Sequence, residues 1–390
     1  MSTGEVRVDV IVVGAGPAGT TAARHCALYG LKTLLLEKSR LPRAKPCAGG
    51  VTVAAISELG LDIPENIIER KCTGLHIQFR GLENEVQSPE PISYMVTRSK
   101  FDHYLAAMAV RAGTLLYEDE ECIDIEQEND RIVVRTDQRV LCAPVIIGAD
   151  GYFSSVRKLF QPKFDRGEIR YCVLSNIPMS PHEISSRFND LITIQYGFVS
   201  NGYAWIFPKG SCLSVGAGGV LSQSRDLPNR FREFLSLNHL NPDAELRGCF
   251  IPVSRWRHDI YTDRILLAGD AAGLVDSFSG EGIRYAIASG KLAAETVITA
   301  HHRGDFTTQT LHEYQERCWN DMGRDLDKSN RATDLISRHP NLFFGAIVGN
   351  DEAMKHYMRT VTGEISFSDF TGWIKGRMLR YLIRSFLLPG

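Results

Sequence analysis

Long apolar runs and an excess of one charge are both missing from this sequence of 390 residues. Its 44 lysines and arginines nearly balance 46 aspartates and glutamates, which leaves a formal net charge of -2. We therefore expect no surface that binds nucleic-acid phosphates. The apolar stretch at residues 342–348 is far shorter than the roughly 20 residues that span a bilayer. The first residues lack the basic and apolar regions of a secretion signal, so the sequence predicts a cytoplasmic globular protein.

Cysteine spacings typical of a metal site or a disulfide framework are also missing. The nine cysteines are odd in number, and no two have C-x-x-C spacing. This pattern favours reduced thiols in a cytosolic protein over zinc ligands or a secreted disulfide scaffold, so we predict no metal. The length and the 44% hydrophobic content allow a large core divided into two or three structural regions.

Residues 8–37 contain the first motif, which has the order strand, glycine-rich turn, helix, strand. The strand at residues 8–13 leads into Gly14-Ala15-Gly16-Pro17-Ala18-Gly19, and a helix then runs to about residue 29. A second strand at residues 33–36 ends at Glu37. Such glycines permit a tight turn, the approach of backbone amides to a pyrophosphate, and close helix packing, while the acid accepts hydrogen bonds from a ribose. We predict dinucleotide binding by Gly14, Gly16, Ala18, Gly19 and Glu37.

Two later segments favour FAD over NAD. Apolar strands end at Asp150-Gly151 and at Gly269-Asp270, and the carboxyl ends of such strands are where α/β sheets bind ligands. With residues 8–37, these segments resemble the FAD-binding pattern of the flavoprotein hydroxylase superfamily, which includes hydroxylases, halogenases and isoprenoid reductases. The resemblance implies that Asp270 contacts the ribityl chain. For Asp150, a cofactor contact and a turn-stabilising role both remain open.

Two helix starts complete the predicted cofactor site. The segment at residues 97–105 resembles the Arg-x-x-x-Asp-x-x-Leu helix start of that superfamily, which implies that Arg98 approaches FAD, although a solvated arginine is the alternative. Gly280, Gly282 and Ile283 precede and begin a long amphipathic helix that runs through residue 300. Its amino terminus, directed at a flavin, would favour the negative charge that develops on reduction.

The middle of the chain predicts an antiparallel sheet. Short strands with hairpin turns lie at residues 192–198, 203–207 and 211–218. Tyr203, Trp205 and Phe207 fall on one face of a strand, where they either pack beneath a helix in an ordinary core or line an apolar pocket. Gly216 and Gly218 on the next strand leave room for a long ligand or for close backbone approach.

Three separate segments resemble the geranylgeranyl reductase family. They are the Tyr-x-Trp-x-Phe-Pro motif at residues 203–208, the Pro-Cys-x-Gly-Gly loop around Cys47, and the Gly-Glu-Gly-Ile turn at residues 280–283. The resemblance implies FAD-dependent reduction of isolated C=C bonds in geranylgeranyl-type chains of a prenyl diphosphate or prenyl lipid. Hydride would come from flavin N5, and Tyr203, Trp205, Phe207, Gly216 and Gly218 would contact the substrate. Cys47 would orient the alkene or relay a proton to it, whereas the alternative is a small residue that fills a loop.

The predicted fold class is α/β, with a Rossmann-like FAD-binding domain, an inserted antiparallel sheet that binds substrate, and a helical carboxyl-terminal region. We assign residues 1–75, 97–165 and 253–300 to the FAD-binding domain, 76–96 and 166–252 to the substrate domain, and 301–390 to the helical region. Basic and apolar positions alternate at helical spacing in residues 373–384. They form either a solvated capping helix or a peripheral contact with the cytoplasmic membrane face.

Two other functions share the same features. One is a flavin-dependent monooxygenase or halogenase, and the other is a flavin-carrying lipid-binding protein without catalysis. The electron donor is left open between NAD(P)H and ferredoxin, because no second glycine-rich nucleotide motif is present.

Overall fold

The computed structural model describes residues 5–253, 255–256 and 258–387, with residues 378–387 described by their backbone only. Its nucleotide-binding part is built on a six-stranded sheet of order β19-β20-β13-β2-β3-β9, in which all neighbours are parallel except β19 and β20. The strands are β2 (Val10–Val13), β3 (Thr33–Leu36), β9 (Leu115–Tyr117), β13 (Val145–Gly148), β19 (Tyr261–Thr262) and β20 (Ile265–Leu267). The side chains of β2, β3 and β20 are buried throughout, as expected for parallel strands covered on both faces. The predicted Rossmann-like unit is confirmed.

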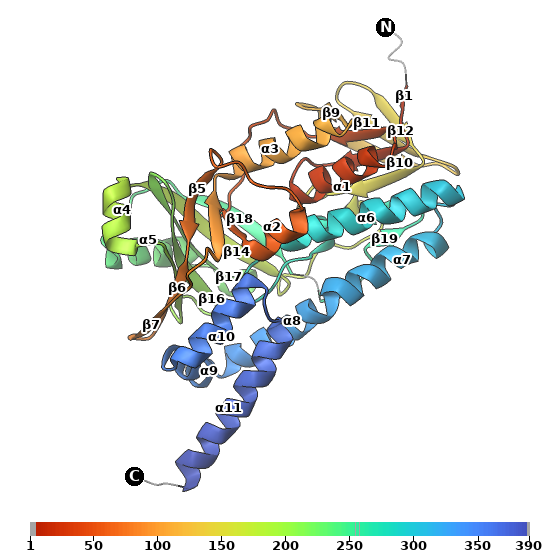
Figure 1. The fold of residues 1–390 in the computed structure, drawn as a ribbon. Coiled ribbons are helices and arrows are strands. Elements are labelled where there is room, and N and C mark those ends of the chain that lie inside the picture. Colours follow the sequence, from red (N-terminus) through yellow and green to blue (C-terminus); the bar gives the residue numbers. More distant parts are fainter. Residues whose placement is uncertain (1–4, 254, 257, 388–390) are drawn as a thin grey trace.

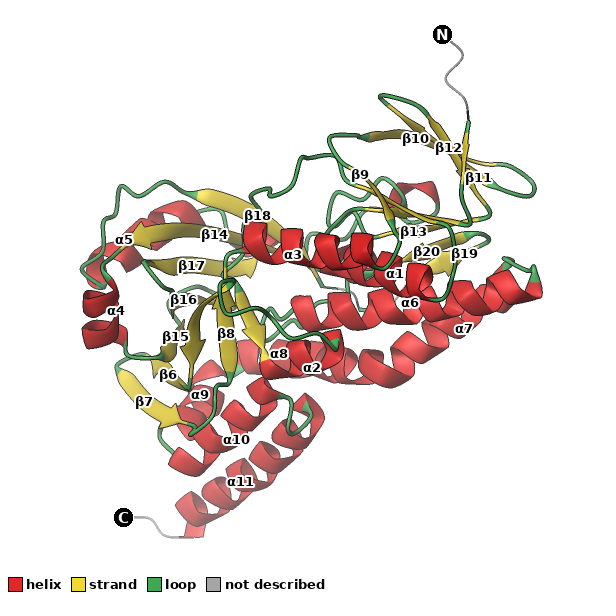
Figure 2. Ribbon diagram, turned by 45° about the horizontal axis from the view of Figure 1, so that its top comes forward, coloured by secondary structure: helices red, strands yellow, loops and turns green. Residues whose placement is uncertain are grey.

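Long helices pack beside this sheet (Figures 1 and 2). A Cβ atom on Gly290 would lie 2.3 Å from the Ala18 carbonyl oxygen, so a glycine there lets two of the helices approach closely. This contact holds the start of the helix at residues 17–28 against the helix at residues 283–303. The helices are α1 (Pro17–Leu28), α2 (Val53–Leu59), α3 (Arg98–Arg111), α6 (Ile283–Arg303) and α7 (Thr308–Cys318).

A seven-stranded sheet of order β18-β14-β17-β16-β15-β6-β7 forms the second part of the molecule. It is antiparallel except for the β6–β15 pair, which the sequence did not predict. One face packs against α4 (Pro181–Phe188) and α5 (Leu227–Leu237). The strands are β6 (Gly74–Phe79), β7 (Leu82–Gln87), β14 (Ile169–Pro178), β15 (Leu191–Tyr196), β16 (Gly202–Pro208), β17 (Cys212–Val220) and β18 (Arg247–Pro252).

Two smaller sheets complete the strand structure described. A three-stranded sheet has the order β4-β8-β5, and a four-stranded sheet has the order β1-β12-β11-β10. The domain boundaries given above remain a prediction. The strands within residues 68–96 divide between the three-stranded and the seven-stranded sheet. The strands are β1 (Val6–Arg7), β4 (Gly50–Thr52), β5 (Ile68–Cys72), β8 (Ser93–Val96), β10 (Cys122–Gln127), β11 (Ile132–Thr136) and β12 (Val140–Ala143).

Helices follow one another through the rest of the chain, as predicted, and the last of them gather at one end of the large sheet (Figure 1). Phe344, Ile347 and Tyr357 share a hydrophobic cluster there with Ile77 and Tyr196 of the sheet. No helix in the described part of the chain is long and apolar enough to cross a membrane. The carboxyl-terminal helices are α8 (Arg324–Arg338), α9 (Pro340–Val348), α10 (Asp351–Thr362) and α11 (Phe367–Leu387).

Candidate active site

A cavity of about 1210 Å³ lies between the two large sheets and the carboxyl-terminal helices. It extends from the glycine-rich turn after β2 to aromatic side chains of α9 and α10. Pockets for one small ligand typically measure about 300–1,000 Å³. The cavity therefore has room for a cofactor and a second ligand.

The glycine-rich turn is built so that the amino terminus of α1 opens into this cavity. Gly14 has φ 102°, and a Cβ atom there would lie 2.5 Å from the Ala149 carbonyl oxygen. A Cβ atom on Gly19 would lie 1.8 Å from the Gly14 carbonyl oxygen. Gly16 differs from both, because no atom of the described residues apart from its chain neighbours lies within 4 Å of its Cβ position, and the residue lines the cavity. The space above Gly16 is thus open to a ligand.

This difference gives a test of cofactor placement. We expect Gly16→Ala to weaken FAD binding at least ~10-fold, about 1.4 kcal/mol, without lowering the melting temperature of the cofactor-free protein. Gly16 has φ -82°, a conformation that alanine adopts without strain. FAD titration and thermal unfolding of the cofactor-free chain measure the two effects.

Gly167→Ala is the matched control, because Gly167 is exposed and also has no atom near its Cβ position. Equal FAD affinity in both variants would contradict a pyrophosphate above Gly16. A lower melting temperature of Gly16→Ala alone would assign the glycine to folding.

A chain of ion pairs connects Glu37 with Cys47. Glu37 accepts a hydrogen bond from the Ala15 amide at 3.0 Å and pairs with Arg43 at 3.2 Å. The fully buried carboxylate of Asp102 accepts hydrogen bonds from Arg43 at 2.9 Å and from Arg98 at 2.7 and 2.9 Å. Burial alone would lower the pKa of Arg98, but the charge of Asp102 and a hydrogen bond with the Cys47 thiol raise it. Arg98 therefore stays charged beside Cys47.

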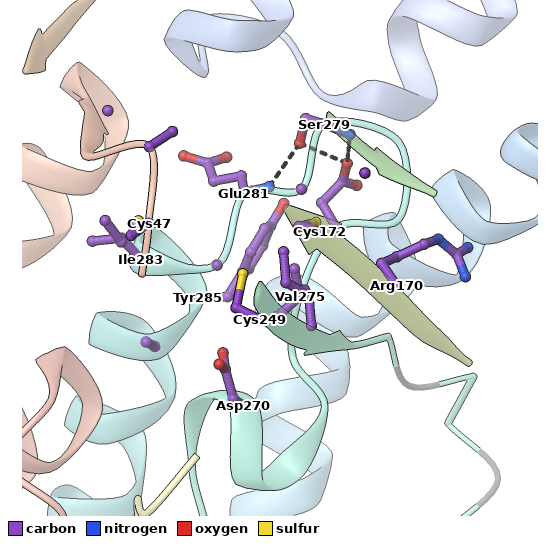
Figure 3. Close-up of a pocket in the computed structure, with 18 of the residues that line it drawn as sticks. Cys47, Arg170, Cys172, Cys249, Asp270, Val275, Ser279, Glu281, Ile283 and Tyr285 are labelled. Atoms are coloured by element: carbon purple, nitrogen blue, oxygen red, sulfur yellow. Dashed lines mark hydrogen bonds between the residues drawn. The ribbon is translucent and has the colours of Figure 1, made fainter. Parts of the chain in front are cut away.

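The turn before α6 forms another wall of the cavity (Figure 3). Asp276 shapes this turn by accepting hydrogen bonds from the Ser279 amide at 2.6 Å and hydroxyl at 2.7 Å. Glu281 accepts a hydrogen bond from Thr52 at 2.6 Å. Burial raises the pKa of the Glu281 carboxyl, although this bond and the charge of Arg284 act in the opposite direction. Glu281 thus keeps a proton to a higher pH than an ordinary carboxyl does.

Two carboxylates at strand ends face the same cavity. Asp270 follows β20, and its carboxylate accepts no hydrogen bond from the described part of the chain. Asp150 follows β13, and its Oδ2 accepts a hydrogen bond from the Ser155 amide at 2.6 Å. Its Oδ1 is buried and has no partner among the described residues. These acceptors fit a ligand that carries hydroxyl groups.

The inner face of the seven-stranded sheet carries the predicted aromatic row. Ring centroids lie 6.0 Å apart for Tyr203 and Trp205 and 6.4 Å apart for Trp205 and Phe207, and all three line the cavity. The row continues to the loop that contains Cys47, because a Cβ atom on Gly50 would lie 3.2 Å from Phe207.

Two of the three glycines of β17, Gly216 and Gly218, had been assigned to the substrate, and their surroundings differ from the prediction. Gly216 does not line the cavity, because the indole of Trp205 fills its space and would lie 2.1 Å from a Cβ atom there. Gly216 therefore lies behind the indole and not at the cavity surface, where the sequence analysis had expected it. Gly218 lines the cavity, but the Cys172 sulfur takes part of its free space and would lie 2.5 Å from a Cβ atom on this glycine.

Most of the other residues that the sequence nominated lie around this one cavity. The exception is Gly19, which packs beneath the turn as a structural glycine. The cavity-lining candidates are Gly14, Gly16, Ala18, Glu37, Cys47, Arg98, Tyr203, Trp205, Phe207, Gly218, Asp270, Gly280, Gly282 and Ile283.

The far wall of the cavity and the carboxylate beside Arg98 were not predicted from the sequence. Phe344 and Tyr357 of the carboxyl-terminal helices line the cavity, as do Tyr196 and Phe278. Phe344 belongs to the apolar stretch at residues 342–348, which had indicated only that no membrane span is present. Asp102 lies one helical turn after Arg98, a spacing that predicts an ion pair.

Comparison with known proteins agrees with this geometry. Residues 7–190 match the family described as FAD binding domain. The digeranylgeranylglycerophospholipid reductase of Methanocaldococcus jannaschii is 31% identical over 326 residues, which cover 79% of this chain and 81% of that protein. The chain belongs to the digeranylgeranylglycerophospholipid reductase family.

A solved structure of a geranylgeranyl bacteriochlorophyll reductase-like protein from Thermoplasma acidophilum also resembles this family member. Its TM-score is 0.82 at 25% identity, and the alignment covers 97% of this chain and 99% of that one. The flavin-dependent brominase Bmp2 has a TM-score of 0.73 at 18% identity, with 96% and 100% of the two chains covered. That likeness shows the shared fold alone.

This member of the digeranylgeranylglycerophospholipid reductase family is therefore an FAD-dependent oxidoreductase of the geranylgeranyl reductase type. Its cavity fits FAD, because the open space above Gly16 and the carboxylate of Asp270 both face it.

Proposed function

We propose that this protein reduces isolated C=C bonds in the geranylgeranyl chains of a digeranylgeranylglycerophospholipid. The observation that carries the proposal is a single cavity that joins the dinucleotide-binding turn to an aromatic-lined apolar space. The names of relatives from Methanocaldococcus jannaschii and Thermoplasma acidophilum support this substrate class.

In this proposal Gly16 and Ala18, at the amino terminus of α1, would hold the FAD pyrophosphate. Glu37 receives the adenosine ribose, and Asp270 receives hydroxyls of the ribityl chain. Arg98 approaches the cofactor from α3, while Gly280, Gly282 and Ile283 place the amino terminus of α6 at the ring. When bound in reduced form, FAD supplies the hydride that alkene reduction consumes.

The prenyl chain lies along Tyr203, Trp205 and Phe207 and extends toward Phe344 and Tyr357 of the carboxyl-terminal helices. Burial of apolar area provides about 25 cal/mol per Å², so a long chain gains most of its affinity from this wall. Aromatic faces also stabilise the cationic character that develops on an alkene as it accepts a proton.

An isolated alkene has no carbonyl to stabilise negative charge, so a proton must arrive as hydride is transferred. Cys47 is the group that we propose orients the alkene or relays this proton, and the charged Arg98 beside it holds the thiol in place. Glu281 is a second titratable group in the cavity; burial raises its pKa, and it accepts a hydrogen bond from Thr52. These side chains and the apolar walls keep bulk water away from the reacting carbons.

An anaerobic experiment tests this function. The FAD-loaded protein is reduced chemically, mixed with digeranylgeranylglycerophospholipid in vesicles, and followed by flavin absorbance and lipid mass. We expect flavin reoxidation and a gain of two hydrogens for each bond reduced. Chemical reduction makes the result independent of whether NAD(P)H or ferredoxin is the natural donor.

Absence of reoxidation until oxygen is admitted would favour a monooxygenase or halogenase. Lipid binding without any change in lipid mass would favour a flavin-carrying lipid-binding protein.

We also propose peripheral contact with the membrane, since the substrate is a lipid. Arg377 lies 4.8 Å from the Trp373 ring at the start of the basic segment, whereas the side chains of residues 378–384 lie outside the described part. If this contact exists, we expect the protein to sediment with anionic vesicles but not with neutral vesicles, and vesicle sedimentation measures it.

A further inference from the structure

Two cysteines lie directly opposite one another on neighbouring strands of the large sheet. Cys172 of β14 pairs with Cys249 of β18 in an antiparallel register without irregularity. Directly opposed residues in such a pair have Cα atoms about 4.5–5.5 Å apart. Disulfides connect Cα atoms about 4.4–6.8 Å apart, so the backbone already has the spacing of a disulfide. Both residues are free thiols.

Both thiols belong to the cavity wall (Figure 3). Cys172 is 5% exposed, whereas Cys249 is half-buried and therefore accessible from the cavity. The Cys172 sulfur lies over Gly218, where a Cβ atom would be 2.5 Å away. The glycine gives the thiol its place on the inner face, on the same side of the sheet as Cys249. A small oxidant that enters the cavity can reach Cys249.

The two thiols also differ in acidity in the way that dithiol chemistry requires. The hydrogen bond from Cys172 lowers the pKa of Cys249, helped by the charge of Lys45 and opposed by burial and Asp270. The same bond and burial raise the pKa of Cys172 well above its ordinary value. Burial raises the pKa of Cys122, another half-buried cavity thiol, to about 12. Thiolate character favours reaction at Cys249.

We propose that Cys172 and Cys249 are a peroxide-sensitive dithiol pair that closes to a disulfide in the cavity wall. The Cys249 thiolate attacks one oxygen of hydrogen peroxide, and the O–O bond breaks. Hydroxide is the leaving group, and Cys249 becomes a sulfenic acid. Cys172 then attacks that sulfur, the S–O bond breaks, and water leaves with the Cys172 proton. Two thiols and one peroxide thus give one disulfide and two waters, and an added dithiol reverses the change by exchange. The pair goes beyond alkene reduction and does not depend on it.

Peptide mapping of the FAD-loaded full chain tests the pair. The protein is titrated with hydrogen peroxide, its remaining thiols are alkylated, and peptides are separated without reductant. We expect a Cys172–Cys249 crosslinked peptide, a mass loss of two hydrogens, and recovery of both thiols with dithiothreitol. Cys249 should react at least ~10-fold faster than Cys122.

Two near-isosteric variants separate the steps. In Cys172→Ser we expect peroxide to leave a dimedone-reactive sulfenic acid on Cys249, because the second thiol is missing. In Cys249→Ser we expect no such product on Cys172. Full alkylation of both cysteines after peroxide, a crosslink from Cys47 instead, or equal reaction at Cys122 would overturn the proposal. These measurements need no substrate, so a negative result for the thiol pair would not contradict the proposed function, and the reverse also holds.

Discussion

Cys47→Ala is expected to keep its FAD while its rate of alkene reduction falls about 100-fold or more, the usual contribution of a positioned proton donor. The residue lines the cavity beside Arg98, and Arg98 remains held by Asp102 when the thiol is removed. The surrounding charges therefore stay in place. Flavin content and single-turnover reduction of a prenyl lipid under anaerobic conditions measure the two quantities separately.

Cys212→Ala is the matched control for Cys47→Ala, because Cys212 is also half-buried but lies outside the cavity lining. Cys47→Ser distinguishes the two roles left open for the thiol. A hydroxyl keeps the size and a hydrogen bond to Arg98 but releases a proton far less readily. Recovery of turnover in Cys47→Ser indicates positioning, whereas a loss as large as in Cys47→Ala indicates proton delivery. Unchanged turnover in Cys47→Ala would remove the residue from the mechanism.

The nucleotide-binding unit could be predicted from sequence because its determinants are local. The turn at residues 14–16 is followed directly by α1, which begins at Pro17, and β3 begins and ends where the run at residues 33–36 predicts. Gly14 is required by the neighbouring strand end at Ala149 and Gly19 by the carbonyl of Gly14, whereas Gly16 leaves open space for a ligand. Asp270 was predictable for the same reason, since it follows a buried strand at the ligand-binding edge.

The features that could not be predicted depend on contacts between distant segments. The parallel β6–β15 pair joins residues 74–79 to 191–196, and no short-range pattern marks it. The carboxyl-terminal helices form the far wall of the cavity only because Phe344 and Tyr357 fold back onto the sheet. Gly216 was assigned to the substrate because a glycine indicates free space, whereas the neighbouring Trp205 occupies that space. The thiol pair was also missed, since Cys172 and Cys249 meet only through strand register.

Trp205→Ala is expected to weaken prenyl substrate binding about 30-fold while leaving FAD affinity within about 2-fold. The Tyr203 and Phe207 rings pack against the indole; if its loss and their displacement together remove about 80 Å² of contact with the chain, binding weakens by about 2 kcal/mol, which corresponds to that change in affinity. Trp205 is 7% exposed and stands between Tyr203 and Phe207 in the cavity wall. Titrations with a prenyl lipid and with FAD give the two affinities. Equal losses of both would identify Trp205 as a core residue instead.

A second change separates the channel wall from simple packing. Trp205→Ala also leaves a void above Gly216, and truncating a buried tryptophan costs about 3–5 kcal/mol of stability. With the indole gone, a Cβ atom on Gly216 no longer meets the atoms 2.1 and 2.6 Å away that exclude it in the native protein. Adding Gly216→Ala to Trp205→Ala should therefore restore part of the melting temperature without restoring prenyl affinity. Recovery of both together would mean that the indole acts through folding alone, and the aromatic row would then lose its assignment as the substrate wall.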